Sequence, residues 1–235
     1  GYENGDRVDD HYDPMIAKII ASGANREVAR RRLIRALEDT VILGATTNRR
    51  FLVDCLRHEA FAAGEATTAF IASAFEGGPV APTPTSGSIA LCGVLLAKLR
   101  GSTEAGVTRM WSSTGRSESL LRLEFGADLY DVRLSLHAEN HYEVEVEGHG
   151  EHTVRLLSFD PLETRARVKL DGVQQNVDAL LAGATLYVRD GANDWVTEDA
   201  LRRPRRRHRL AQPEPVTVAD HPAVVGVVLK GRIGP

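Results

Sequence analysis

The decisive stretch is His11-Tyr12-Asp13-Pro14-Met15-Ile16-Ala17-Lys18-Ile19-Ile20-Ala21-Ser22-Gly23, in which a turn precedes a short apolar run. Proline biases the preceding residue toward an extended backbone and has no amide donor, so Asp13 and Pro14 form the turn. The run from Met15 to Ala21 has the length of a strand and is bounded by Pro14 and Gly23. An apolar run of this kind predicts a strand buried on both faces.

Lys18 is the charged residue inside this run. One interpretation is a lysine whose stem packs while its amine reaches solvent or pairs with a carboxylate. The other is that Asp13 and Lys18 face a catalytic cleft or a subunit interface. Both interpretations fit the sequence.

Two helices follow. Asn25 is a good N-cap, Glu27 complements the dipole of the first turn, and Ala29, Leu33 and Leu37 form one buried stripe. A second helix over residues 47–58 buries Phe51, Leu52, Cys55 and Leu56. The arginines between the apolar positions of the first helix lie on its wet face, which argues against a nucleic-acid site.

This region resembles the closing segment of the biotin carboxylase domain of biotin-dependent carboxylases. The resemblance begins with the turn and the Met15-Ile16-Ala17-Lys18 strand and continues at fixed offsets over residues 7–71. The matching positions are Arg26, Ala29, Leu33, Ala36, Leu37, Gly44, Thr47, Asn48, Phe51, Leu52, Phe61, Gly64, Thr68, Ala69, Phe70 and Ile71. It implies a parent enzyme that is a ligase and that uses biotin and Mg-ATP.

The amino-acid composition limits the number of domains, the kinds of partner and the compartment that we expect. The 235 residues can hold one large or two small domains, and a formal net charge of −3 gives no global case for a nucleic-acid or membrane partner. Cys55 and Cys92 lie in apolar contexts and predict buried thiols without a disulfide. We expect a cytoplasmic protein, or a mitochondrial matrix protein if the source is eukaryotic. The chain starts in mid-motif without an initiator methionine, so we expect a fragment.

A boundary is predicted at residues 76–87, which are rich in Pro, Gly, Thr and Ser. Residues 88–100 then form a helix, with Ser88 as its N-cap, that is apolar on all sides and must be enclosed. From about Ser119 to Glu198, short alternating runs are separated by turn signals such as Asp171-Gly172. Seven or eight antiparallel strands at this spacing predict a barrel or sandwich, and a barrel around the helix satisfies both patterns.

The fold class is therefore α+β, with the C-terminal piece of a biotin carboxylase domain at residues 1–75 and a helix-plus-barrel domain at residues 88–200. Residues 201–235 form a basic, proline-containing tail that we interpret as a linker. The second domain resembles the interaction domain that joins the biotin carboxylase region to the carboxyltransferase β-subunit in acyl-CoA carboxylases of the methylcrotonyl-, geranyl- and propionyl-CoA type. This resemblance implies docking on that subunit, with Trp111 as an aromatic anchor or as part of its own barrel. Self-association through the biotin carboxylase region is a further expectation.

The chemistry of the family is not carried by these residues. No glycine-rich phosphate loop occurs, and Met15 and Met110, the two methionines, do not flank a lysine that could carry biotin. His137, His141, His149 and His152 lack metal-ligand spacing, and no Ser/His/Asp arrangement stands out. We expect no catalytic, cofactor-binding or metal-binding residue here and an inactive fragment. Two alternatives remain: a stand-alone binding module, and a fragment of a pyruvate- or urea-type carboxylase.

Overall fold

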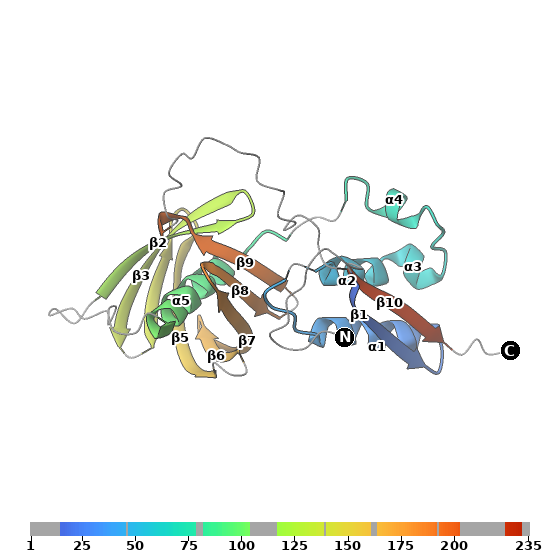
Figure 1. The fold of residues 1–235 in the computed structure, drawn as a ribbon, viewed down its shortest axis with the longest axis horizontal. Helices are drawn as coiled ribbons and strands as arrows, with labels where there is room; N and C mark the ends of the chain where they lie inside the picture. Colours follow the sequence, from blue (N-terminus) through green and yellow to red (C-terminus); the bar gives the residue numbers. More distant parts are fainter. Residues whose placement is uncertain are drawn as a thin grey trace. The chain divides into compact units, whose positions relative to one another are not determined.

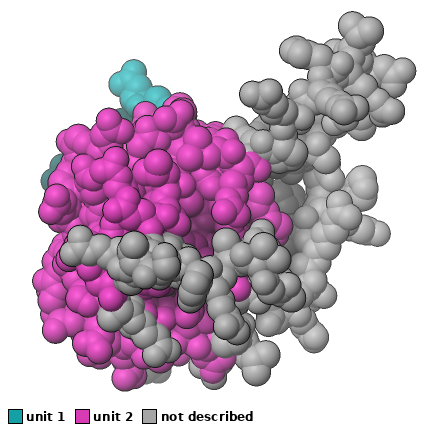
Figure 2. Space-filling model, turned by 90° about the vertical axis from the view of Figure 1, so that its left-hand side faces the viewer, with its two compact units in different colours: residues 1–81, 208–235 teal, residues 82–207 magenta. Residues whose placement is uncertain are grey.

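A computed structural model describes residues 15–45, 47–78, 82–103, 117–138, 140–160, 164–191, 193–202 and 224–231. The chain divides into two compact units (Figures 1 and 2), residues 1–81 with 208–235, and residues 82–207. Figure 1 shows α1 to α4 in the first unit, whereas the second unit consists mostly of the strands of a barrel around α5.

The first unit places helices against a two-stranded sheet. Strand β1 (Met15–Gly23) pairs in parallel with β10 (Val224–Gly231), and α1 (Arg26–Asp39) packs on β1. The chain continues through α2 (Arg49–Arg57), α3 (Glu59–Ala63) and α4 (Phe70–Ala74). The sequence analysis placed β10 within a linker, so a strand in residues 201–235 is a correction.

The helix signals of this unit are confirmed. The Asn25 side chain accepts a hydrogen bond from the Val28 amide at 2.9 Å, and Ala29, Leu33 and Leu37 are buried. The second helix begins at Arg49 instead of Thr47. Phe51 and Leu52 are only half-buried, whereas Cys55 and Leu56 are buried as expected. The described core of this unit centres on Leu33, Leu37, Val53 and Leu56.

The prediction of a strand buried on both faces is wrong for β1. Met15 is 38% exposed and Ile20 is 53% exposed, and the other residues of the strand are half-buried or exposed. The physical reason is coverage: β1 packs on α1 and pairs with β10, and the described residues place no second layer over its other face. An apolar run alone does not say how many layers cover it.

The second unit is a closed antiparallel barrel (Figure 1). Its strands are, in order, β2 (Ser117–Phe125), β3 (Asp128–Ala138), β4 (His141–Val146), β5 (Gly150–Asp160), β6 (Arg165–Leu170), β7 (Val173–Ala182), β8 (Thr185–Asp190) and β9 (Asn193–Asp199). Each strand pairs with the next, and β2 pairs with β9 to close the ring. A short 3₁₀ turn, η1 (Ala200–Arg202), follows.

Alternation along the strands points apolar side chains inward. Tyr142, Val144 and Val146 of β4 are buried, while Glu143 and Glu145 between them are exposed, as predicted. Three apolar residues of the strands are exposed instead: Leu129 at 57%, Leu157 at 41% and Val173 at 67%. A bulge between Leu156 and Ser158 accounts for Leu157, because the extra residue breaks the alternation.

Helix α5 (Ser86–Thr103) shares its core with the barrel. Every residue from Ile89 to Leu96 except Gly93 belongs to one cluster of buried side chains with residues of all eight strands. The helix contacts β2, β3, β4, β5, β7 and β8. No described helix is both long and apolar enough to cross a lipid bilayer.

The helix starts two residues before the predicted N-cap. Thr85 takes the capping role, because its Oγ1 accepts a hydrogen bond from the Ser88 amide at 3.1 Å. Ser88 lies inside the first turn and its hydroxyl donates to Asp190 Oδ2 at 3.1 Å. Ser88 was expected to cap its own helix and instead ties that helix to β8.

Candidate functional site

The residues singled out by the sequence analysis are scattered. Lys18 lies on β1 and is exposed. This exposure agrees with a lysine that keeps its amine in water, and its role at a cleft or interface stays a prediction. Asp13 and Trp111 lie outside the described residues. The candidate site of the described chain is therefore built from polar contacts at the ends of α5 and on the barrel surface.

Three polar side chains that are far apart in sequence meet at the N-terminal end of α5. His152 of β5 contacts Asp171 Oδ2 through Nδ1 at 2.6 Å and Ser86 Oγ through Nε2 at 2.8 Å. Asp171 is held by the turn between β6 and β7, where Asp171 and Gly172 have φ values of 47° and 88°. Sequence analysis missed this group, because register across three elements brings it together and no local motif announces it.

Electrostatics make Asp171 the anionic member of this group. Burial alone would raise the pKa of Asp171, but hydrogen bonds from His152 and from the Thr153 amide, with the nearby imidazole, outweigh it and lower that pKa. The Thr153 amide donates to Asp171 Oδ1 at 2.8 Å. Asp171 therefore stays ionised and holds the His152 ring in place.

The order of contacts is that of a nucleophile, a base and an orienting acid. The surroundings favour a structural tether. The Asp171 side chain is 46% exposed, and a Cβ on Gly87, next to Ser86, would come within 3.2 Å of Leu170 Cδ2. Ser86 itself is half-buried, and its hydroxyl contacts the His152 ring. The group fastens the first turn of α5 to β5 and to the β6–β7 turn.

Asp199 fastens the opposite end of the helix. Its side chain is 1% exposed and accepts a hydrogen bond from Arg100 Nη1 of α5 at 2.9 Å. The same carboxylate accepts from the Arg122 amide of β2 and the Leu201 amide of η1, each at 3.2 Å. One buried acid at the end of β9 therefore neutralises the helix arginine and joins the strands that close the barrel.

Several charges on the outer surface of the barrel are paired. Arg122 contacts Asp131 at 2.6 Å, Arg133 contacts Glu145 at 2.6 Å, and Arg165 contacts Asp178 at 3.3 Å. His137 Nε2 lies 2.6 Å from a carboxylate oxygen of Glu143. Glu143 and Glu145, the exposed acids of β4, therefore each have a basic side chain beside them.

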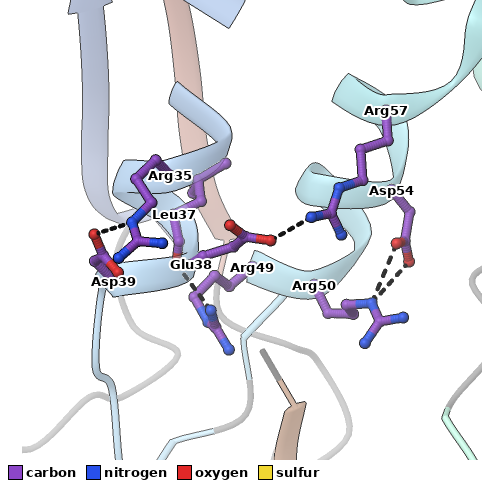
Figure 3. Close-up of polar contacts among 8 residues, drawn as sticks. All are labelled: Arg35, Leu37, Glu38, Asp39, Arg49, Arg50, Asp54 and Arg57. Atoms are coloured by element: carbon purple, nitrogen blue, oxygen red, sulfur yellow. Dashed lines mark hydrogen bonds and ion pairs between the residues drawn. The ribbon is translucent and has the colours of Figure 1, made fainter. Parts of the chain in front are cut away.

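The first unit carries a separate network of arginines (Figure 3). Arg57 of α2 reaches Glu38 of α1 at 2.5 Å, while Arg50 contacts Asp54 within α2. Arg49 is 1% exposed and donates from Nη1 to the Leu37 carbonyl at 2.8 Å. A buried guanidinium that satisfies a carbonyl near the end of α1 links the two helices. This contact was also missed, because nothing in the sequence distinguishes the buried Arg49 from its half-buried neighbour Arg50.

The thiols carry no reactive signature. Cys55 and Cys92 are free and buried, and burial raises the pKa of both. A raised pKa keeps the thiol protonated and poorly nucleophilic. Among the described residues, no group of three or more His, Cys, Asp or Glu side chains is arranged to hold a metal ion.

Comparisons with known proteins identify relatives of the first unit. Residues 1–73 match the family model of the biotin carboxylase C-terminal domain. These residues are related to biotin-dependent carboxylases. Methylcrotonoyl-CoA carboxylase subunit alpha of Dictyostelium discoideum is 45% identical over 71 residues, which are 30% of this chain and 10% of that protein. Propionyl-CoA carboxylase alpha chain of Caenorhabditis elegans is 32% identical over 102 residues, covering 42% of this chain and 14% of that protein.

Pyruvate carboxylase of Pichia angusta is 48% identical over 61 residues, which are 26% of this chain and 5% of that protein. The chain therefore spans a small part of the length of these relatives. The resemblance to biotin carboxylases read from the sequence is confirmed, and an antiparallel barrel follows the matched region. The activity, substrates and partners of the whole protein are matters of proposal.

Proposed function

We propose that the chain is part of the α-subunit of a biotin-dependent acyl-CoA carboxylase. The observation that carries the proposal is the order of the two parts: residues 1–73 match the biotin carboxylase C-terminal domain, and a closed eight-stranded barrel containing α5 in its core follows. That order resembles the α-subunits of the acyl-CoA carboxylases. The match to the propionyl-CoA carboxylase alpha chain covers more of this chain than the family model does.

The parent enzyme, in this proposal, carboxylates biotin with Mg-ATP and bicarbonate, and a partner subunit passes the carboxyl group to an acyl-CoA. Biotin and Mg-ATP belong to other parts of the parent protein. In this proposal, the residues of this chain form subunit contacts and take no part in catalysis. Their buried ion pairs and tethers make the scaffold for those contacts rigid. Localisation in the cytoplasm, or in mitochondria as in the named relatives, is part of the same proposal.

The barrel is the proposed interaction domain, with α5 as its central helix. The linker expected at residues 76–87 then ends before Ser86, where α5 begins. Tethering both ends of α5 fixes the barrel rim, so loops that leave the rim start from defined positions. Trp111 lies in the connection between α5 and β2, and we propose it as an anchor on the carboxyltransferase β-subunit. Buried aromatic anchors dominate interface energy. The first unit, with Asp13 and Lys18, is the proposed self-association surface.

Calorimetric titration of the 235-residue chain with the carboxyltransferase subunit of a methylcrotonyl- or propionyl-CoA carboxylase tests this proposal. Micromolar or tighter binding that is lost in Trp111→Ala, while the circular dichroism spectrum is unchanged, supports docking. Absence of binding by a folded chain contradicts it. The chain alone should show no bicarbonate-dependent ATP hydrolysis and no streptavidin labelling after expression with a biotin ligase.

A second candidate is a parent of the pyruvate carboxylase type. The 48% identity to the Pichia angusta protein over 61 residues favours it. A carboxylase of that type would not need a separate β-subunit to receive the barrel. The binding titration therefore separates the two candidates. A stand-alone binding module is the reading that remains if the barrel is folded and neither type of carboxyltransferase binds.

A further inference from the structure

The inner wall of β9 carries polar groups inside an otherwise apolar core. Trp195 and Thr197 occupy alternate positions of this strand and are 5% and 1% exposed, while Val196 between them is 40% exposed. Alternate residues of a strand lie on the same face, so both side chains point into the barrel. Within the part of the chain that the structure describes, Trp195 Nε1 and Thr197 Oγ1 have no hydrogen-bond partner.

The side chains beside these two atoms are hydrocarbons. On β8, Val188 opposes Trp195 and Leu186 opposes Thr197, and both are buried. The ring of Phe125 meets the indole in an edge-on contact, with 6.3 Å between the ring centroids. Valine, leucine and phenylalanine offer no conventional acceptor or donor, and a buried polar atom that stays without a partner is costly. The two atoms therefore need a partner from elsewhere.

The path of α5 leaves more depth in front of β9 than in front of the strands on either side of it. The helix makes its closest approaches to β2, β3, β4, β5, β7 and β8. The backbone of the helix therefore lies farther from β9 than from β8 and β2, which flank it in the ring. The large indole of Trp195 fills part of this depth, and its N–H group is buried there.

We propose that the barrel binds one ordered water molecule at the inner wall of β9, where it bridges Trp195 Nε1 and Thr197 Oγ1. The water accepts a hydrogen bond from the indole and shares a second one with the hydroxyl, which can donate or accept. Alternate residues of a strand lie about 6.5–7 Å apart, and two hydrogen bonds of about 2.9 Å through one water span nearly that distance. Buried waters of this kind pair polar groups that the protein does not pair itself. The inference is independent of the proposed function.

The charges near this wall favour water over an ion. Asp199, the next inward residue of β9, already accepts hydrogen bonds from Arg100 and from two backbone amides. Trp195 and Thr197 are neutral, and the side chains around them are apolar. An ion at this place would lose its hydration without gaining a counter-charge, whereas a neutral water keeps two of its hydrogen bonds.

Nuclear magnetic resonance of the ¹⁵N-labelled 235-residue chain tests this inference. The chain has 2 tryptophans, so Trp111→Phe leaves the indole N–H of Trp195 as the remaining signal of its kind and assigns it. This signal should show a nuclear Overhauser cross-peak to water, with the sign of a long-lived contact. Its hydrogen exchange with solvent should be slow at the same time, because the water that it contacts is enclosed with it.

Thr197→Val removes the hydroxyl and nearly keeps the size of the side chain. The water cross-peak should disappear, and the equilibrium constant for unfolding should rise about fivefold, because a hydrogen bond of ordinary strength is lost. Thr197→Ser keeps the hydroxyl and should keep the cross-peak. Thr153→Val is the matched control: Thr153 is exposed on β5, so its cross-peak should equal that of the wild type and its unfolding constant should stay within about twofold.

The direction of the stability change separates a bound water from the alternative. If the indole N–H points at the ring of Phe125 and the hydroxyl has no partner, Thr197→Val should stabilise the chain, because it removes an unsatisfied polar atom. Absence of the cross-peak in the wild type overturns the inference, whatever the variants do. A cross-peak that persists in Thr197→Val, or a Thr197→Val chain more stable than the wild type, also overturns it.

Discussion

The two units differ in the extent of their cores and in their similarity to a known family. In the first unit, the described core is small and β1 is partly exposed, yet this is the region that matches the biotin carboxylase C-terminal domain. In the second unit, which lies beyond the match that ends at residue 73, one buried cluster joins α5 to all eight strands. Residue-by-residue likeness and closure of a core are therefore separate properties, and each unit shows one of them clearly.

The largest expected effect tests closure. Leu95→Asp puts a carboxylate into the interior of the barrel, where Leu95 is 1% exposed and belongs to the shared core. Stranding a charge without a partner costs about 4 kcal/mol or more, so we expect insoluble or molten protein. Thermal unfolding followed by near-ultraviolet circular dichroism measures this.

Leu120→Asp is the control for Leu95→Asp, because Leu120 lies on β2 and is 63% exposed. It should change stability by less than about 0.5 kcal/mol. If Leu95→Asp melted like the wild type, α5 would lie outside a closed core, and the contrast between the two units would disappear.

The barrel's pattern was readable from sequence because alternation and turn residues are local. Strand β4 and the Asp171-Gly172 turn were predicted correctly. The contacts of Asp199 and of His152 were not, since each depends on the register of strands that are distant in sequence. Arg49 was missed for the same reason, and the exposed side of β1 was missed because a local run does not reveal its neighbours.

The second expected effect tests how the barrel closes. Asp199→Ala removes the carboxylate that accepts hydrogen bonds from Arg100 and from two backbone amides. Breaking a buried pair leaves one charge uncompensated and costs about 3–5 kcal/mol. The free energy of unfolding in urea measures the loss.

Asp131→Ala provides the comparison for Asp199→Ala, since Asp131 also pairs with an arginine but its side chain is 38% exposed. Surface pairs contribute about 0–1 kcal/mol, so this variant should unfold close to the wild type. Equal losses in the two variants would mean that Asp199 acts as an ordinary surface charge and that the seam between β2 and β9 needs no buried acid.

A third effect, about 1–3 kcal/mol, compares the packing of the two units at glycine. A Cβ on Gly23 would lie 2.6 Å from the backbone nitrogen of Ala29, so Gly23→Ala must push α1 away from β1. A Cβ on Gly93 would meet Val132 Cγ1 at 3.3 Å, a side-chain atom. Gly93→Ala should therefore stay within about 1 kcal/mol of the wild type, helped by the better helix propensity of alanine.

Urea unfolding of both alanine variants gives the answer. A larger loss for Gly93→Ala than for Gly23→Ala would show that the side chains of the barrel yield less than the backbone of the first unit. The barrel, and not the contact between β1 and α1, would then be the part that adjusts less to an added methyl group.

The smallest expected effect, about 1 kcal/mol, concerns the tether between Asp171, His152 and Ser86. Because the folded state lowers the pKa of Asp171, its contribution to stability is present above the unfolded pKa, near 3.8, and is lost as pH falls through the folded pKa. Asp171→Asn keeps a residue that tolerates a φ of 47° but removes the charge. The wild type should exceed this variant in melting temperature at pH 6, and the difference should shrink as pH falls from about 5 to about 3. Glu151→Gln, an exposed change on the same strand as His152, should show no such convergence. If the difference between wild type and Asp171→Asn stays constant across this range, the ionised carboxylate of Asp171 does not stabilise the fold, and the helix is held at that end by Thr85 and Ser88 alone.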